Sequence, residues 1–182
     1  ATIDKYIGDA MMVFFGDPDS NGEKEDARSC VKMALKMRDR ISFLQDKWQK
    51  QGFAEPFVIR MGMNTGYCNV GNFGSDQRLT YTIIGSEVNI AQRLEASAQP
   101  GGILMSYETY AHAQDLIEVE QLNSISMKGV RREIKVFSIL NKIRQKSRIK
   151  TSSQKIKNVP ERIGDRLEAL ETKIEEILDR IK

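Results

Sequence analysis

The amino-acid sequence predicts an α+β domain followed by a helical segment at its C-terminal end. Short β-prone runs joined by glycine turns alternate with amphipathic stretches, and no strict strand-helix-strand repeat orders them. The chain has 182 residues, of which 40% are apolar, enough for one ordinary core. A heptad pattern appears only after Pro160, which separates a tail from the domain.

The chain opens with the pattern of a β-hairpin. The β-prone runs at residues 2–7 and 10–15 flank Gly8 and Asp9. A glycine in a two-residue connection suits a tight turn, so we expect Asp9 to lie in the turn.

A long helix is predicted next. Ser20 and Glu23 have the spacing of a capping box at a helix start. Apolar residues then recur at steps of three and four, as on one face of an amphipathic helix: Ala27, Val31, Ala34, Met37, Ile41, Leu44 and Trp48.

The middle of the chain predicts a second hairpin, a further strand and a helix with one polar face. Residues 57–63 and 67–70 form the hairpin around the turn 64–66, and a strand over 79–84 ends at Gly85. The helix starts near Ser86 as its cap. Its apolar side is formed by Val88, Ile90, Ala91 and Leu94, whereas Asn89 and Arg93 project together from the polar side.

The last part predicts a strand over 103–106, a short helix over 107–113 and strands near 116–119 and 133–140. We expect the domain to cover residues 1–140 and a basic linker to cover 141–159. Residues 160–182 carry a heptad seam that predicts a coiled coil, formed by Ile163, Leu167, Leu170, Ile174, Ile177 and Ile181. An amphipathic helix docked on its own domain is the alternative interpretation of this seam.

Composition excludes several classes of protein. The net charge of +3 arises from the tail, because residues 141–182 hold 12 basic and 7 acidic groups, so we predict no nucleic-acid partner. The longest apolar run is too short for a membrane span, which leaves a membrane link only through an upstream module. Two cysteines form no disulfide framework and indicate a cytoplasmic setting. The sequence lacks a zinc-ligand cluster and a Walker A motif.

Four separated clusters carry the chemistry. They are Lys5-Tyr6-Ile7-Gly8-Asp9, Arg60-Met61-Gly62-Met63-Asn64-Thr65-Gly66, the segment from Tyr81-Thr82 through Gly85 and Asn89 to Arg93-Leu94-Glu95, and Met127-Lys128-Gly129. In order and spacing they resemble class III nucleotidyl cyclases, specifically bacterial adenylyl cyclases, over residues 1–140. The resemblance implies a ferredoxin-like fold with a mixed, mostly antiparallel sheet and with helices. It also implies conversion of ATP to cyclic AMP and pyrophosphate.

The resemblance assigns roles to individual residues. Asp9 matches a metal carboxylate of a site that uses two Mg²⁺ or Mn²⁺ ions, while Asn89 and Arg93 match the pair that orients the ribose and stabilises the transition state. Lys5 and Thr82 match the positions that select the base, and their identities favour ATP. Arg60 and Lys128 match positions that contact the triphosphate.

Each of these residues also has an ordinary structural interpretation. Taken alone, Asp9 is an Asx turn, and Asn89 with Arg93 is a solvated helix face. Lys5 and Thr82 could point outward from strands for solubility. Only the four clusters together favour the functional assignment.

The resemblance further implies a head-to-tail homodimer with sites between the subunits. The family's first metal aspartate belongs to a segment upstream of residue 1, so we expect the domain to be incomplete at its N-terminus and the chain to be inactive by itself. Two alternatives stay open. One is a catalytically silent cyclase homologue that dimerises or senses nucleotides, and the other is a guanylyl cyclase, which Lys5 disfavours.

Overall fold

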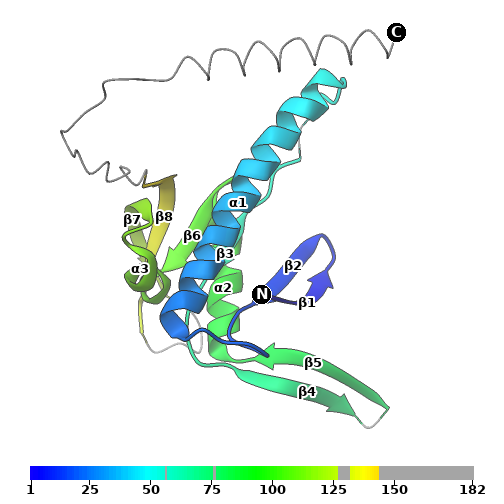
Figure 1. Cartoon of the computed structure of the whole chain (residues 1–182), viewed down its shortest axis with the longest axis vertical. Helices are drawn as coiled ribbons and strands as arrows, with labels where there is room; N and C mark the ends of the chain where they lie inside the picture. Colours follow the sequence, from blue (N-terminus) through cyan, green and yellow to red (C-terminus); the bar gives the residue numbers. More distant parts are fainter. Residues whose placement is uncertain (56, 76, 127–131, 144–182) are drawn as a thin grey trace, which may run out of the picture. The chain divides into compact units, whose positions relative to one another are not determined.

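A computed structural model describes residues 1–55, 57–75, 77–126 and 132–143. Their elements follow the order β1 to β8 with three helices between them (Figure 1). Within these residues no helix is both long and apolar enough to cross a membrane. The predicted coiled coil, nearly all of the predicted linker and Lys128 lie outside the described residues.

A four-stranded mixed sheet forms the centre of the domain. It contains β3 (Met61–Met63), β6 (Ile103–Ser106), β8 (Ile134–Lys142) and β7 (Ile117–Ile125) in that order. β3 and β6 are parallel, whereas β6 with β8 and β8 with β7 are antiparallel. The predicted mixed, mostly antiparallel sheet is therefore confirmed.

Alternating residues of the sheet bury two apolar clusters, one on each face. The first cluster joins odd-numbered residues of β6 and β8 to helix α1 (Glu23–Lys50) and α3 (Tyr107–Ala113): Val31, Ala34, Leu35, Met63, Ile103, Met105, Ala113, Ile117, Phe137 and Ile139. The second joins even-numbered residues to helix α2 (Ser86–Ser97): Ile90, Leu94, Ala98, Leu104, Ile134 and Val136. Because β6 is covered on both faces, all four of its residues are buried.

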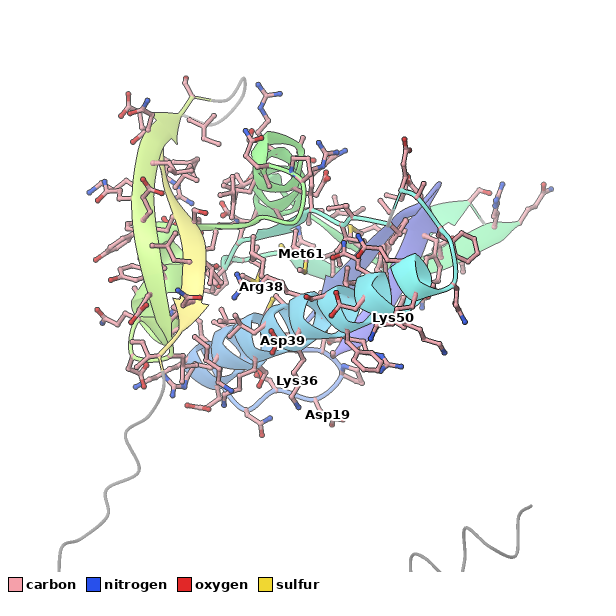
Figure 2. The ribbon with its side chains drawn as sticks, turned by 90° about the horizontal axis from the view of Figure 1, so that it is seen from above. Asp19, Lys36, Arg38, Asp39, Lys50 and Met61 are labelled. Atoms are coloured by element: carbon pink, nitrogen blue, oxygen red, sulfur yellow. The ribbon has the colours of Figure 1, made fainter. Side chains whose placement is uncertain are left out.

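Helix α1 packs the predicted apolar stripe against the sheet. Ala27, Val31 and Ala34 of that stripe are buried. Figure 2 shows that Arg38 of α1 lies on the side of the helix that faces Met61 of β3. Lys36 lies on the opposite side of the helix. Arg38 donates hydrogen bonds to main-chain oxygens of β8, which further fixes the helix.

The predicted capping box at the start of α1 is wrong. The N-cap residue is Gly22, and no side chain caps the helix. The Ser20 hydroxyl donates instead to the Asp26 carboxylate at 2.5 Å and accepts from the Gly22 amide at 3.0 Å. Asp26 also accepts from the Asn21 amide, so its carboxylate binds the segment that precedes the helix.

The predicted first hairpin is confirmed. β1 (Thr2–Ile7) and β2 (Ala10–Phe14) pair antiparallel, and Gly8 adopts a φ of 64° in the turn between them, where glycine avoids a steric penalty.

The predicted second hairpin is wrong. β3 pairs with β6, and β4 (Asn69–Ser75) instead forms a ribbon with β5 (Arg78–Ile84) next to α2 (Figure 1). Residues 64–66 do not form the turn of a hairpin. Asn64 donates to the main-chain oxygen and the carboxylate of Glu87 in α2, and the Thr65 hydroxyl bonds to that of Thr109 in α3. The close approach of β3 to α2 depends on Gly62, since a Cβ there would lie 2.2 Å from the Glu95 nitrogen.

Candidate active site

Lys5 and Thr82, the two residues predicted to select the base, meet at the carboxylate of Asp4. The Thr82 hydroxyl donates a hydrogen bond of 3.0 Å to Asp4 Oδ2. The Lys5 ammonium lies 3.3 Å from the same oxygen. Residues 78 positions apart in the sequence are thus joined between β1 and β5.

A β-bulge explains how neighbouring residues of one strand can face the same place. Ile3 pairs with Val13 and Lys5 with Met12, so Asp4 is an extra residue in β1. In a regular strand Asp4 and Lys5 would point to opposite faces. A bulge changes the direction of these side chains, which brings the carboxylate of Asp4 to the ammonium of Lys5.

Burial differs sharply within this group. The side chain of Asp4 has no exposed surface, whereas that of Lys5 is 39% exposed. Thr82 is almost completely buried. The Lys5 ammonium is therefore the exposed charge of the group, and it forms an ion pair with the buried carboxylate of Asp4.

Asp9 is exposed in the turn between β1 and β2. Within the described residues, no group of three or more His, Cys, Asp or Glu side chains could hold a metal ion. The carboxylate oxygens of Asp9 are of the type that Mg²⁺ prefers, and Mg²⁺ usually binds through one or two carboxylates plus phosphate oxygens and water. Asp9 therefore fits as one ligand of such a site.

Asn89 and Arg93 lie on the exposed face of α2, as predicted. The helix begins directly after β5, the strand that carries Thr82. Its buried face, which includes Ile90 and Leu94, packs against the sheet, so Asn89 and Arg93 point to the exposed side of the helix.

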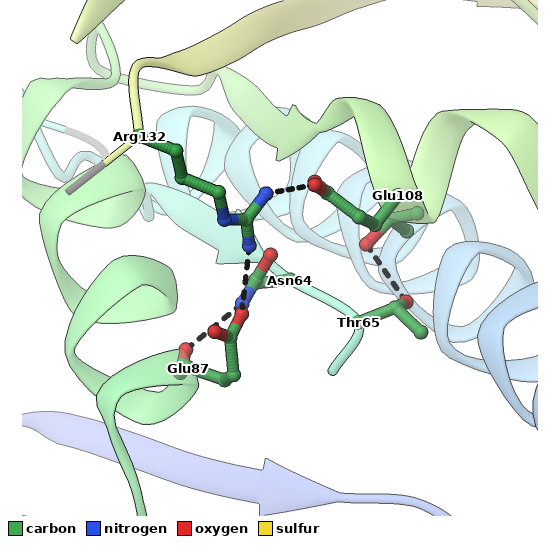
Figure 3. A network of polar contacts seen from close by, with 6 residues as sticks. Asn64, Thr65, Glu87, Glu108 and Arg132 are labelled. Carbon is green, nitrogen blue, oxygen red and sulfur yellow. Dashed lines mark hydrogen bonds and ion pairs between the residues drawn. The ribbon is translucent and has the colours of Figure 1, made fainter. Parts of the chain in front are cut away.

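A polar network fixes the start of α2 (Figure 3). Glu87, in the first turn, accepts a hydrogen bond of 2.8 Å from the Asn64 side chain and forms an ion pair of 3.2 Å with Arg132. Arg132 also pairs with Glu108 of α3. Three segments that are distant in the sequence therefore converge on the helix that carries Asn89.

Gly66 allows the connection after β3 to approach this network. A Cβ on Gly66 would lie 2.6 Å from Cγ of Glu87 and 2.7 Å from its Oε2. The connection and the first turn of α2 are therefore in direct contact, and a larger residue at position 66 would require the Glu87 side chain to move.

Arg60 is paired with an acidic side chain of α2. Its guanidinium forms an ion pair of 3.0 Å with Glu95, in the last turns of α2. Both side chains are partly exposed, at 45% and 35%. Its predicted contact with the triphosphate stays a prediction, and a phosphate would have to compete with Glu95.

Two titratable groups flank the site in their neutral forms. The Tyr81 hydroxyl donates to Asp17, and this hydrogen bond raises the pKa of the tyrosine. Burial, with a smaller contribution from the charge of Glu87, raises the pKa of the Cys68 thiol. Neither residue is thereby prepared to act as a base or a nucleophile at neutral pH.

Sequence reasoning missed Asp4 and Glu87. An aspartate inside a β-prone run is unusual, because strands are depleted in this residue, and this was the available signal for Asp4. Glu87 had no such signal, since an acidic residue in the first turn of a helix is favoured by the helix dipole alone.

Residues 4–141 match the family model of the adenylate and guanylate cyclase catalytic domain. Among curated proteins, adenylate cyclase 1 of Rhizobium meliloti is 27% identical over 145 residues, which are 79% of this chain and 21% of the relative. The chain thus spans about one fifth of that relative's length, and 7% of an adenylate cyclase from Dictyostelium discoideum.

Solved structures of two cyclases are also similar to this chain. The adenylyl cyclase CyaB from P. aeruginosa is 48% identical with a TM-score of 0.72, and the match covers 77% of this chain and 71% of CyaB. The guanylyl cyclase Cya2 is 30% identical with a TM-score of 0.67, and the match covers 76% of this chain and 68% of Cya2. One match is named an adenylyl cyclase and the other a guanylyl cyclase, so these two similarities by themselves do not distinguish ATP from GTP as the substrate.

Proposed function

Because the chain belongs to the family of adenylate and guanylate cyclase catalytic domains, we propose that it is an adenylyl cyclase domain that converts ATP to 3′,5′-cyclic AMP and pyrophosphate. The observation that carries the choice of ATP is the meeting of Lys5 and Thr82 at Asp4. Lys5 can donate to N1 of adenine, and Thr82 can accept from the 6-amino group. The identity of 48% with the adenylyl cyclase CyaB supports the same choice.

In the proposed reaction the ribose 3′ oxygen attacks the α-phosphorus. A new bond forms between these two atoms, the bond from the α-phosphorus to the bridging oxygen breaks, and the proton of the 3′ hydroxyl passes to solvent. Pyrophosphate leaves with the bridging oxygen and its electron pair. Negative charge grows on the phosphoryl oxygens, so a donor aimed at them lowers the barrier.

Asn89 and Arg93 are the residues to which we assign this step. The Arg93 guanidinium presents a planar set of donors to phosphoryl oxygens, and Asn89 positions the ribose. Both residues are exposed on one face of α2, which the network around Glu87 holds in place. Arg60 and Lys128 are the further candidates for contact with the triphosphate.

Asp9 is the residue of this chain that we assign to a divalent cation, Mg²⁺ or Mn²⁺, of which the reaction uses two. Such ions neutralise charge on the attacking and leaving oxygens. The turn between β1 and β2 presents the carboxylate to solvent, where a nucleotide phosphate can share the ion.

We further propose that the site is completed in a head-to-tail homodimer. One subunit supplies Asp9, and the other supplies Lys5, Thr82, Asn89 and Arg93. Large apolar side chains are exposed on the β1–β2 hairpin and on the β4–β5 ribbon, and they support an interface on these two strand pairs. They include Ile3, Ile7, Met11, Val70, Leu79 and Ile84. Both cysteines are free, in agreement with a cytoplasmic reaction.

The test is nucleotide turnover by the full-length protein with Mn²⁺, supplied with ATP or GTP. We expect cyclic AMP as the main product, and we expect Asn89→Ala and Arg93→Ala each to lower kcat by about a hundredfold or more. Lys36→Ala, on the outer side of α1, is the matched control and keeps full activity. Cyclic GMP as the main product would establish a guanylyl cyclase, and the absence of both products would favour the silent homologue.

A further inference from the structure

Asp4 is a buried carboxylate that the reaction described above does not use. Its side chain has no exposed surface, and its Oδ2 accepts from Thr82 and lies 3.3 Å from the Lys5 ammonium. Its Oδ1 is buried as well and has no hydrogen-bond partner among the described residues. Burying such a group is costly, so its place between two substrate-binding candidates needs an explanation.

The hydrogen bond between Thr82 and Asp4 fixes the direction in which the threonine hydroxyl can act. A hydroxyl has one hydrogen to donate and two lone pairs that accept. An ionised carboxylate only accepts, so the single hydrogen of Thr82 points to Asp4 and only lone pairs remain for a ligand.

The same carboxylate positions Lys5 as a hydrogen-bond donor, whereas it leaves Thr82 as an acceptor. An ammonium has three hydrogens and no lone pair, so Lys5 can pair with Asp4 and still donate to a ligand. The bulge in β1 places both contacts on one oxygen. The pair therefore presents a fixed order, a donor at Lys5 and an acceptor at Thr82.

We propose that Asp4 is a specificity-determining residue, which makes the site selective for adenine by fixing this donor and acceptor order. The inference rests on the proposed function. Adenine offers an acceptor at N1 and a donor at its 6-amino group, which match Lys5 and Thr82. Guanine offers a donor at N1 and an acceptor at O6, so it would place donor against donor and acceptor against acceptor.

Asp4 acts through Thr82 and Lys5 and is therefore a positioning residue. A purely structural role is the competing explanation, because the hydrogen bond also ties β1 to β5. A structural role predicts equal loss of activity with both nucleotides, whereas positioning predicts a change in the preference between them.

The first experiment measures kcat/KM for ATP and GTP in the full-length protein and in Asp4→Asn. The asparagine has the same shape but can also donate from its amide, so Thr82 is free to present its hydrogen to O6 of guanine. We expect the ratio of ATP to GTP to fall by about tenfold. Glu118→Gln, an exposed acid of β7, is the matched control and keeps the ratio.

A double variant tests whether Asp4 acts on base selection through Thr82. Thr82→Val keeps the shape of the side chain and removes the hydroxyl. In that background Asp4→Asn should change the ATP to GTP ratio by less than about twofold, because the hydroxyl that it would release is absent. If Asp4→Asn and Thr82→Val each lower the ATP to GTP ratio, and the double variant lowers it by the product of the two factors, the proposal is contradicted.

Nucleotide analogues provide a measurement that needs no variant. Purine riboside triphosphate keeps the N1 acceptor of ATP and has only hydrogen at C6. We expect the unaltered protein to use it with a kcat/KM about tenfold below that of ATP, since Thr82 then has no amine to accept from. Equal use of this analogue and ATP would overturn the proposal, even if Asp4→Asn failed to fold.

The outcomes separate this inference from the proposed function. If the unaltered protein forms no cyclic AMP, the proposed function itself fails. If it forms cyclic AMP and Asp4→Asn lowers the rates with ATP and GTP equally, the function stands and Asp4 is only structural. If Asp4→Asn lowers the ratio of kcat/KM for ATP to kcat/KM for GTP, and does not lower it in the Thr82→Val background, the result supports both the proposed function and the role of Asp4.

Discussion

Arg28 of α1 and Asp115, which follows α3, form a two-pronged ion pair. The two guanidinium nitrogens lie 2.5 Å and 3.1 Å from the two carboxylate oxygens. Arg28 also donates to the main-chain oxygen of His112. The pair therefore fastens the beginning of the long helix to the end of α3, 87 residues later.

This pair predicts a specific loss of stability in acid. The hydrogen bond from Arg28 lowers the pKa of Asp115 below its ordinary value of 3.8. A carboxyl with a lowered folded-state pKa stabilises the fold fully above its unfolded-state pKa, and the contribution is lost as the pH falls through the folded-state value. Asp115→Asn should therefore have a lower Tm than the unaltered protein at pH 7, and this difference should begin to narrow as the pH falls below about 3.8 and close only below the lowered folded-state pKa.

Thermal unfolding followed by circular dichroism between pH 7 and pH 3 measures this difference. Lys47→Ala, a change of an exposed charge at the other end of α1, is the control for general effects of charge. A difference in Tm that does not narrow at all between about pH 4 and the lowest pH at which the protein still folds would show that the carboxylate charge does not matter.

Gly62→Ala should strongly destabilise the domain. The added Cβ would lie 2.2 Å from the Glu95 nitrogen and 2.3 Å from the Ala91 oxygen, and main-chain atoms cannot move aside as a flexible side chain can. We expect a loss of about 3 kcal/mol or more in the free energy of unfolding, at or above the usual range for overpacking. Urea denaturation is the measurement.

Gly71→Ala is the matched control for this change. A Cβ at Gly71 would have its nearest neighbour at 3.9 Å, the Cε2 atom of Phe73. We expect the free energy of unfolding to change by no more than about 0.5 kcal/mol. Similar urea midpoints for the two alanine variants would mean that β3 does not approach α2 as closely as described.

The Cys30 thiol should be unreactive while the domain is folded. Burial raises its pKa to about 12. At pH 8 only about one thiol in ten thousand is then ionised, and the thiolate is the reactive form. Alkylation with iodoacetamide at pH 8, followed by mass spectrometry, should label Cys30 only after denaturation, and rapid labelling of the native protein would contradict this.

Two inactive variants should restore each other if the site lies between subunits. Asp9→Ala and Arg93→Ala would each be inactive alone. In a mixed dimer one site carries both changes and the other carries neither, so an equal mixture of subunits should recover about one quarter of the unaltered activity. Activity no higher than that of the separate variants, in mixtures verified to exchange subunits, would place both residues in one subunit's site.

Local patterns were sufficient for much of the fold. The hairpin of β1 and β2 followed from two β-prone runs around Gly8, and the apolar periodicity in α1 and α2 predicted both helices and their buried faces. The exposed positions of Asn89 and Arg93 followed as well, because residues four apart share a helix face.

The partners of strands and side chains were decided by tertiary structure. The run that ends at Met63 has the same local pattern whether it folds back on the next run or pairs with β6, and the structure shows the second arrangement, in which Gly62 lies close to the main chain of α2. Asp4 met Thr82 in the same way, through a bulge and a neighbouring strand 78 residues away. Periodicity records which face of an element is apolar, whereas the partner of that face depends on contacts between distant segments, which no local window contains.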